Sequence, residues 1–401
     1  IKSDSKVFDW KIPKEWNVTE AYVIDKNNKR IIDFKNNNLH LVGYSFPVNT
    51  IMEKNEFLKK LHYINKNSDA IPYVTSYYNK YWGFCVNEKQ FNNLKKNYNK
   101  QDKFKIFINS QFNKYGFLNY GELLLPGKSK DEILITTYVC HPSMANNELS
   151  GPLLSIALAK FYSTKKLNRS LRFIFIPETI GSIAYIKKNY KQLNKILFGL
   201  NLTCVGDNKK YSFLQSKYAD TYLDKICLDV YKKLNIKFKK YSFLSRGSDE
   251  RQFNSPNINI PMVSLMRSKY GTYPEYHTSL DNFKFVNAEG IKNSFKIHKI
   301  IIDKLITEKK ENFYFGRIKK NRNIRRKKPY CLIKCEPNMG KRGLYHLISK
   351  KSIKEETKNL MNFIQYADGS NSLEEIRKLI KIPTVTARKI YNILKKEKIV
   401  K

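Results

Sequence analysis

The sequence predicts an α/β fold in which helices cover both faces of a mostly parallel sheet. Two observations support this prediction. Within residues 121–315, runs rich in β-branched and aromatic residues alternate with segments of helical spacing, which is the order typical of a parallel sheet. The strand-like runs "EILITTYVC" and "SLRFIFIPE" are almost wholly apolar, as expected of strands buried on both faces.

Three segments are expected to build this domain and an insertion within it. Residues 1–35 are polar and mixed in composition, and we assign them to the N-terminal part of the α/β domain. Residues 36–120 contain short aromatic and β-branched runs separated by Asn, Lys and Gly, a pattern typical of small antiparallel strands. We therefore expect an inserted small β domain there, and the main part of the α/β domain over residues 121–315.

The C-terminal part of the chain has a different composition. Residues 316–343 include the dense basic run "RIKKNRNIRRKK", and we expect a basic linker there. Residues 344–401 turn helical, with a capping box formed by Ser372 and Glu375. Two short helices and a turn indicate a helix-turn-helix, which we interpret as a packing or partner domain rather than a DNA-binding one. We expect this domain to be dispensable for metal binding, so a chain truncated near residue 310 should stay soluble and keep its zinc.

Composition excludes some classes of protein. The net charge is +40, but Lys is spread through nearly every segment together with abundant Asn, Ile and Tyr, which indicates a coding bias rather than a nucleic-acid-binding face. The sequence contains no run of about eighteen apolar residues, so no membrane span is expected. The six Cys follow no regular disulfide framework, so we expect reduced, buried thiols and a cytoplasmic protein. The oligomeric state stays open, a homo-oligomer included.

Four short polar segments begin where apolar runs end. They are "YVCHPSMANNELSG", "IPETIGS", "SRGSDERQF" and "YPEYHTSLDN", and they contain His141, Glu178, Asp249 and His277. Ligands of parallel sheets bind outside the carboxyl ends of the strands. Two imidazoles and several carboxylates at that edge are the ligand set of a Zn²⁺ ion that activates water. A surface ion-pair network remains an equal alternative for Asp249.

Other residues of these segments have candidate roles. Glu178 ends a very apolar strand, so burial should raise its pKa unless a cation is near, and it is a candidate metal ligand or general base. An ordinary position in the first turn of the following helix is its alternative. Asn147 and Glu148 follow His141 closely enough for the loop to return to the same metal ion. Asp281 could orient the second ring nitrogen of His277.

Nine signatures spread along nearly the whole chain carry a family resemblance. They are "VFDWKIPKEWN", "LHLVGYS", "AIPYVTSYY", "WGFC", "YVCHPSMANNELSGP", "PETIGSIAY", "RGSDERQF", "SLMRSKYGTYPEYHTSLDN" and "CEPNMGKRGLYH". The chain resembles bacterial aminopeptidase-like proteins that are often encoded in polysaccharide-biosynthesis clusters and are related to co-catalytic zinc aminopeptidases. The resemblance implies a zinc-exopeptidase fold, interrupted by a small β domain and ended by a winged-helix-like domain. It places His141, Glu178, Asp249 and His277 at metal or catalytic positions.

One position departs from the family pattern. The family loop resembles His-Pro-Ser-x-Ala-Asn-Asp-Asn, in which the Asp is the expected ligand that bridges two metal ions. Asn147 stands at that position here, and a carboxylate appears one residue later, at Glu148. An amide is neutral and is a weaker zinc ligand. Three alternatives stay open: Glu148 substitutes, the site holds one ion instead of two, or activity is lost.

The expected function is that of a zinc-dependent aminopeptidase or amidohydrolase, linked to surface polysaccharide biosynthesis. One or two zinc ions would activate water for attack on a peptide or amide bond, and Glu178 would accept the proton. The expected substrate is a peptide or a small aminoacyl or amide compound, and neither a membrane nor nucleic acid is an expected partner. The alternative is a catalytically impaired binding or assembly protein, because of Asn147.

Overall fold

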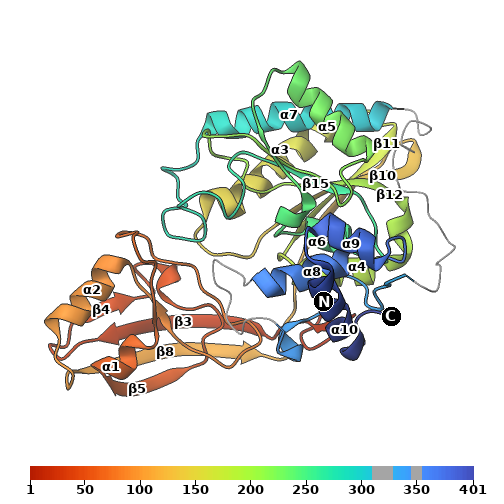
Figure 1. The fold of residues 1–401 in the computed structure, drawn as a ribbon. Helices are drawn as coiled ribbons and strands as arrows, with labels where there is room; N and C mark the ends of the chain where they lie inside the picture. Colours follow the sequence, from red (N-terminus) through yellow and green to blue (C-terminus); the bar gives the residue numbers. More distant parts are fainter. Residues whose placement is uncertain (309–327, 345–354) are drawn as a thin grey trace.

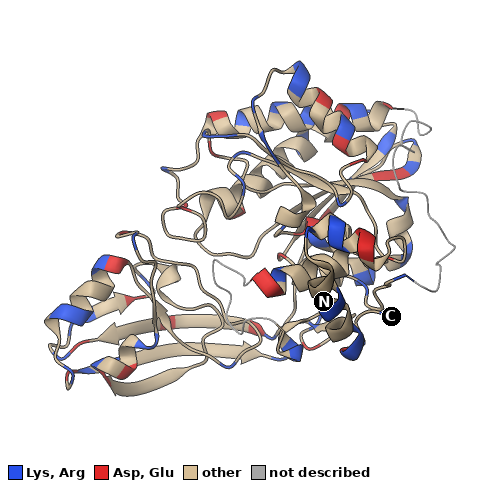
Figure 2. Cartoon of the chain, in the orientation of Figure 1, with Lys and Arg blue, Asp and Glu red and all other residues tan. Residues whose placement is uncertain are grey.

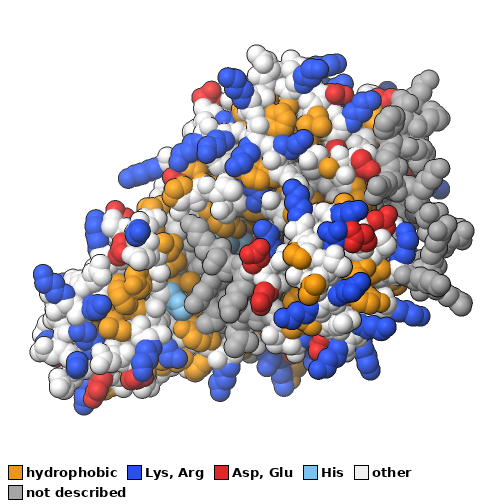
Figure 3. All heavy atoms as spheres, viewed as in Figure 1, with side chains coloured by type: hydrophobic (Ala, Val, Ile, Leu, Met, Phe, Trp, Pro, Cys, Tyr) orange, Lys and Arg blue, Asp and Glu red, His pale blue; other side chains and the backbone are white. Residues whose placement is uncertain are grey.

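The computed structural model describes residues 1–308, 328–344 and 355–401. They form a helix-flanked central sheet, a separate β unit and a C-terminal helical unit that packs beneath the sheet in the view of Figure 1. Lys and Arg residues occur on all three units (Figure 2), and their side chains are scattered over the face seen in Figure 3. None of the helices in the described ranges is long and apolar enough to cross a membrane.

The central sheet has the strand order β14-β13-β15-β12-β10-β11-β9. Its strands are β9 Gly121–Leu125, β10 Ser129–Tyr138, β11 Arg169–Ile176, β12 Ile196–Asn201, β13 Ser212–Leu214, β14 Lys239–Tyr241 and β15 Met262–Met266. The four strands in the middle run parallel, whereas β9 and β13 each join them antiparallel. The sheet is therefore mixed, and the expected α/β fold is confirmed.

Helices cover both faces of this sheet because successive side chains of a strand point to opposite sides. Ile133 and Ile135 of β10 pack on one side against α3, α5 and α7, while Leu134 packs on the other side against α4 and α6. The bounds of these helices are α3 Ser150–Ser163, α4 Ile180–Lys188, α5 Tyr222–Lys233, α6 Glu250–Phe253 and α7 Ala288–Thr307. All the loops that follow the carboxyl ends of the central strands consequently gather at one edge of the sheet.

The β unit begins earlier in the sequence than expected. Its sheet, ordered β4-β3-β8-β5, starts with β3 (Glu15–Ile24), so much of the segment assigned to the α/β domain belongs here instead. The side chains of β3 alternate between core and solvent, and Ala21 and Val23 face the core. Its many polar residues made this alternation hard to recognise in the sequence. The other elements are β4 Arg30–Asp33, β5 Val48–Glu53, α1 Lys54–Leu58, β6 Leu61–His62, β7 Phe84–Cys85, α2 Glu88–Asn97 and β8 Lys103–Asn113. Two shorter strands precede the unit, β1 Lys6–Val7 and β2 Trp10–Lys11.

In its described residues the C-terminal unit contains three α-helices, and it begins before residue 344. Its helices are α8 Glu355–Tyr366, α9 Leu373–Ile380 and α10 Thr384–Lys396. Of the expected basic linker, residues 316–327 lie outside the described residues. Residues 328–343 are packed: Cys331 and Met339 join the core of the helical unit, and Cys335 joins the core beneath the sheet. This part of the chain therefore does not behave as the expected solvated linker.

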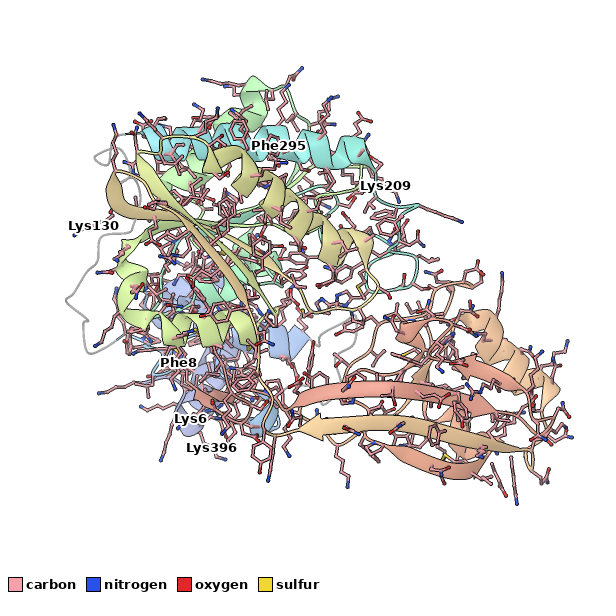
Figure 4. All side chains as sticks on the ribbon, turned by 180° about the vertical axis from the view of Figure 1, so that it is seen from behind. Lys6, Phe8, Lys130, Lys209, Phe295 and Lys396 are labelled. Atoms are coloured by element: carbon pink, nitrogen blue, oxygen red, sulfur yellow. The ribbon has the colours of Figure 1, made fainter. Side chains whose placement is uncertain are left out.

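Buried charges hold the C-terminal unit against the sheet domain. The carboxylate of Glu336 accepts a hydrogen bond from Gln365 at 2.7 Å and lies 3.3 Å from the Arg251 guanidinium. Lys217 pairs with Asp368 at 2.9 Å, and both side chains are buried. The N-terminal segment with Lys6 and Phe8 also lies near Lys396 of α10 in Figure 4, and Trp10 donates a hydrogen bond to the backbone oxygen of Glu336.

This packing changes the expectation for a truncated chain. A truncation near residue 310 removes Glu336, Gln365 and Asp368 and leaves the buried charges of Lys217 and Arg246 without their carboxylate partners. An isolated buried charge is costly. We therefore expect the truncated chain to be unstable, contrary to the expectation from sequence.

A single substitution tests the same docking contact. Asp368→Asn should lower the free energy of unfolding by about 3 kcal/mol, because it leaves the buried Lys217 ammonium unpaired. Glu356→Gln, at an exposed carboxylate of the same unit, is the matched control and should stay within about 0.5 kcal/mol. Guanidinium denaturation measures both. Equal stability of the two variants would show that the ion pair does not hold the unit in place.

Candidate functional site

The strand ends bring three of the predicted residues together. The register pairs Tyr138, the last residue of β10, with Ile176, the last residue of β11. His141 and Glu178 follow directly, and His141 Nε2 lies 3.7 Å from Glu178 Oε2. The loop after β15 brings in His277, whose ring centroid lies 5.0 Å from that of His141. Imidazoles this close can ligate one ion or two adjacent ions.

The second ring nitrogen of His141, Nδ1, lies beside Glu148. It shares a short hydrogen bond with Glu148 Oε1, and the backbone N–H of Cys140 donates to Glu148 Oε2 at 2.8 Å. Glu148 lies on a π-helical turn, η2 (Ala145–Leu149), which leads into α3. Such widened turns are frequent at functional sites. His141 therefore stands between two carboxylates, those of Glu148 and Glu178.

Asn147 directs its side chain elsewhere than its neighbour Glu148. Its amide Nδ2 donates to the Tyr138 hydroxyl at 2.6 Å, and its backbone N–H donates to Asp281 at 3.0 Å. The amide oxygen Oδ1 is buried and has no hydrogen-bond partner within the described part of the chain. The residue at the position where the family resemblance implies a bridging Asp is therefore neutral, and only part of its hydrogen-bonding capacity is used.

Asp249 is a buried carboxylate with one unpartnered oxygen. Oδ1 accepts hydrogen bonds from the backbone N–H of Thr179 at 2.8 Å and from the Ser182 hydroxyl at 2.5 Å. Oδ2 is buried without a hydrogen-bond partner among residues 1–308, 328–344 and 355–401. Burial, followed by the charge of Glu178, raises the pKa of Asp249 to about 8. A carboxylate oxygen in this position favours a cation or a proton beside it.

Glu178 shares this environment. Burial raises the pKa of its carboxyl group, and the charges of His141 and Arg251 partly oppose that rise. Arg251 also donates a hydrogen bond to the hydroxyl of Thr179 at 2.6 Å and pairs with Glu336 of the C-terminal unit. The surroundings of Glu178 are therefore linked to the docking contact of that unit.

Asp281 holds the loop that carries Asn147. Its carboxylate, which the sequence offers as a possible partner for the ring of His277, accepts hydrogen bonds from the backbone N–H groups of Asn146 at 2.6 Å and Asn147 at 3.0 Å. The Tyr273 hydroxyl is a further donor, at 3.4 Å. Burial raises the pKa of Asp281 to about 6. Its observed contacts give it a part in shaping the backbone around the site.

The backbone is strained at three places around the cluster. Ser143, Thr179 and His277 have positive φ values of 56°, 63° and 55°, a region that costs non-glycine residues free energy. Hydrogen bonds hold two of them: Thr179 N–H donates to Asp249, and His277 O accepts from the backbone N–H of Tyr73 at 2.8 Å. Strain of this kind concentrates at functional sites.

Two contributors to the site escaped prediction. Tyr73, from the β unit, lies edge-on to both imidazoles, with ring centroids 4.9 Å from His141 and 5.2 Å from His277. Its only sequence signal was its place in the signature "AIPYVTSYY". Cys140 was expected to be a buried thiol, yet it is exposed, and its sulfur lies 3.7 Å from His141 Nδ1. Its position directly before His141 was the available signal.

A cavity of about 350 Å³ opens beside His141 and Glu148. The β unit forms part of its wall through Asn37, and the Ser143 hydroxyl donates to the side chain of the neighbouring Asn38 at 2.6 Å. The lining residues are Asn37, His141, Ser143, Met144, Ala145, Glu148, Leu149, Ser279, Asp281, Asn282 and Phe283. The cavity could hold a small molecule or the end of a chain.

The side chains gathered here are of the kinds that bind zinc, although within the described residues it is the ligand atoms of Cys140, His141 and Glu148 that all lie within 4.8 Å of one another. His141 and His277 supply imidazole nitrogens, and Glu178 and Asp249 supply carboxylates, which are the side chains that bind zinc in catalytic sites. The buried, unpartnered Oδ2 of Asp249 supports this fit, because a buried anionic oxygen without a hydrogen-bond donor favours a cation partner.

Comparisons with known proteins agree with this architecture. A family model described as "Domain of unknown function (DUF4910)" matches residues 1–308, and a "winged helix-turn-helix" model matches residues 327–401. A Clostridium acetobutylicum protein described as "Putative polysaccharide biosynthesis protein with aminopeptidase-like domain" is 41% identical over 377 residues, which cover 94% of this chain and 81% of that protein.

Solved structures extend the comparison. The structure of a "putative peptidase" from Clostridium acetobutylicum matches with a TM-score of 0.73 and 37% identity, over 100% of this chain and 86% of that one. A zinc aminopeptidase from Bacillus subtilis matches with a TM-score of 0.57 and 14% identity, over 78% of this chain and 87% of that one. The expected zinc-exopeptidase-like fold with a C-terminal winged helix is thereby confirmed.

The metal-free protein should lose stability as the pH rises from about 4 to about 8. The pKa of Asp249 is about 8 in the folded state, and that of an unfolded aspartate is about 3.9. Across this window the folded state keeps a proton that the unfolded state releases, so the free energy of unfolding falls. Asp249→Asn removes this contribution and should flatten the decline.

Urea denaturation in the presence of a chelator, at about pH 5 and about pH 8, measures this decline. Asp4→Asn, at an exposed aspartate, is the control and should keep the decline of the parent protein. If Asp249→Asn declines as steeply as the parent, the carboxyl group of Asp249 does not cause the pH dependence.

Proposed function

We propose that this chain, which belongs to the DUF4910 family, is a zinc-dependent aminopeptidase or amidohydrolase. The observation that carries the proposal is the meeting of His141, His277 and Glu178 at the carboxyl ends of the parallel strands, with the unpartnered oxygen of Asp249 buried among the same loops. His141, His277 and Asp249 would hold the metal. A bound zinc ion would polarise a scissile carbonyl group and lower the pKa of water.

Glu178 is the proposed general base. Burial raises the pKa of its carboxyl group, which brings it closer to the neutral range in which a group can both accept and release a proton. Its side chain retains some exposure, 19%, so that it can reach a substrate. The charges of His141 and Arg251 oppose part of this rise in pKa and favour the ionised form, which accepts a proton.

The position of the β unit supports a substrate with a free end. The unit contributes Asn37 to the lining of the cavity beside His141, and an exopeptidase needs a cleft that is blocked at one end. Peptides or small aminoacyl and amide compounds are therefore the proposed substrates. The name of the Clostridium acetobutylicum relative supports a place in polysaccharide biosynthesis, and six unpaired cysteines fit a cytoplasmic location.

Asn147 supports a second candidate function, that of an aminopeptidase-like protein with impaired catalysis that serves binding or assembly. The neutral amide removes one negative charge from the position where the family carries the bridging Asp, and its Nδ2 is engaged by Tyr138. Fewer charges weaken the binding of two dications. In this alternative the fold and a weak metal site persist without hydrolysis.

Substitution of Glu178 separates the two candidates. Glu178→Gln keeps the shape and removes the base, so hydrolysis of a panel of aminoacyl anilides should fall by about 100-fold or more while the fold survives. Glu56→Gln, at an exposed carboxylate of the β unit, is the matched control and should retain full activity. Circular dichroism and thermal melting report the fold of each variant.

The impaired alternative gives a different pattern. The parent protein would hydrolyse none of the anilides, and Glu178→Gln would melt at the same temperature or higher, because it removes a largely buried charge whose desolvation is costly. An active parent whose rate survives Glu178→Gln would leave a zinc hydrolase in place but would remove Glu178 as its base.

A further inference from the structure

His141 presents one nitrogen to each of two carboxylates. Nδ1 shares a short hydrogen bond with Glu148, and Nε2 lies 3.7 Å from Glu178. A neutral imidazole carries a proton on one nitrogen and a lone pair on the other. One ring nitrogen can therefore ligate a metal ion, while the other donates a hydrogen bond.

The carboxylate of Glu148 is occupied on both oxygens. Oε1 faces His141 Nδ1, and Oε2 accepts the backbone N–H of Cys140 at 2.8 Å. Only 5% of the Glu148 side chain is exposed, so water cannot easily replace these contacts. A metal-ligating histidine commonly donates its second ring N–H to a carboxylate, which fixes the tautomer and the orientation of the ring.

We propose that Glu148 positions His141 instead of replacing the carboxylate missing at Asn147, so that Nε2 is the ligand atom and the site holds a single zinc ion. This inference rests on the proposed zinc-dependent function. It resolves the alternatives that the change at Asn147 left open in favour of one ion.

The balance of charge supports a single ion. Glu178 lies on the Nε2 side of His141. Together with Asp249, whose Oδ1 accepts the backbone N–H of the adjacent Thr179, it supplies two negative charges, which match one dication. A second dication would need a further anion there, but Asn147 is neutral and Glu148 lies on the Nδ1 side. An uncompensated charge in so buried a place is strongly unfavourable.

A rival site lies on the Nδ1 side. Ligand atoms of Cys140, His141 and Glu148 all lie within 4.8 Å of one another, and the sulfur is 3.7 Å from Nδ1 and 3.9 Å from Glu148 Oε1. Ligands of a tetrahedral zinc ion are separated by about 3.5 Å, given bond lengths of about 2.0–2.3 Å. The rival site must, however, break the hydrogen bond between His141 Nδ1 and Glu148 Oε1, whereas the Nε2 site keeps it.

The experiment compares Glu148→Ala and Glu148→Gln with the parent protein. A glutamine side-chain oxygen can still accept from Nδ1–H but carries no charge. If Glu148 positions the ring, Glu148→Ala should weaken zinc affinity by about 10- to 100-fold, and Glu148→Gln should recover most of this loss. Circular dichroism checks the fold, and Glu56→Gln again serves as the surface control.

Two further readouts identify the ligand atom and the number of ions. Metal analysis of the zinc-loaded parent should give one ion per chain, and Asn147→Asp should raise this number towards two. X-ray absorption at the zinc edge should show nitrogen and oxygen neighbours and no sulfur at about 2.3 Å. In the metal-free protein, a low-field imidazole N–H proton should appear by NMR and disappear in Glu148→Ala.

Several results would overturn the proposal. A zinc–sulfur distance in the X-ray absorption data would place the ion at Cys140. Two ions per chain in the parent protein would give Glu148 a bridging role. Equal losses of zinc affinity in the Gln and Ala variants would make the charge of Glu148 the essential property. Absence of zinc from the parent would refute the proposed function. The NMR signal of the metal-free protein would then still decide whether Glu148 holds His141.

Discussion

The parallel pairing of β10 with β11 is the constraint on which the candidate site depends. It aligns Tyr138 with Ile176. The two strands therefore end at the same level, and His141, which follows β10, lies beside Glu178, which follows β11. Because side chains alternate along a strand, a slip of one residue would turn every side chain of the strand to the other face. The apolar side chains on both faces of these strands oppose such a slip, and the same burial that fixes the register fixes the site.

Burial also gives the site its chemical character. The carboxyl groups of Glu178 and Asp249 lie in surroundings from which most water is excluded. This desolvation raises the pKa of both groups. The strained backbone at Thr179 and His277 adds to the free energy stored in these loops. A bound cation would relieve the cost of the carboxylates, so stability and metal binding are linked at one place.

The site is assembled from more than the sheet domain. The β unit contributes Tyr73, whose ring touches both imidazoles, and its loop forms one wall of the cavity. The C-terminal winged helix acts at a greater distance, through Glu336, which forms an ion pair with Arg251. Arg251 in turn donates a hydrogen bond to the hydroxyl of Thr179, the residue after Glu178. Changes in either unit can therefore alter the surroundings of Glu178 without touching the candidate ligands.

The sequence alone determined the features that arise from local patterns. Apolar runs and helical spacing identified the central strands and helices, and polar residues directly after those strands identified His141 and Glu178. Only the tertiary structure decided that Tyr73 lies over the imidazoles, that β3 belongs to the β unit and that residues 328–344 are packed. It also separated Glu148, which faces His141, from Asn147, which faces Tyr138. These outcomes depend on contacts between residues far apart in the chain and on the turn of a π-helix, and neither leaves a periodic signal in the sequence.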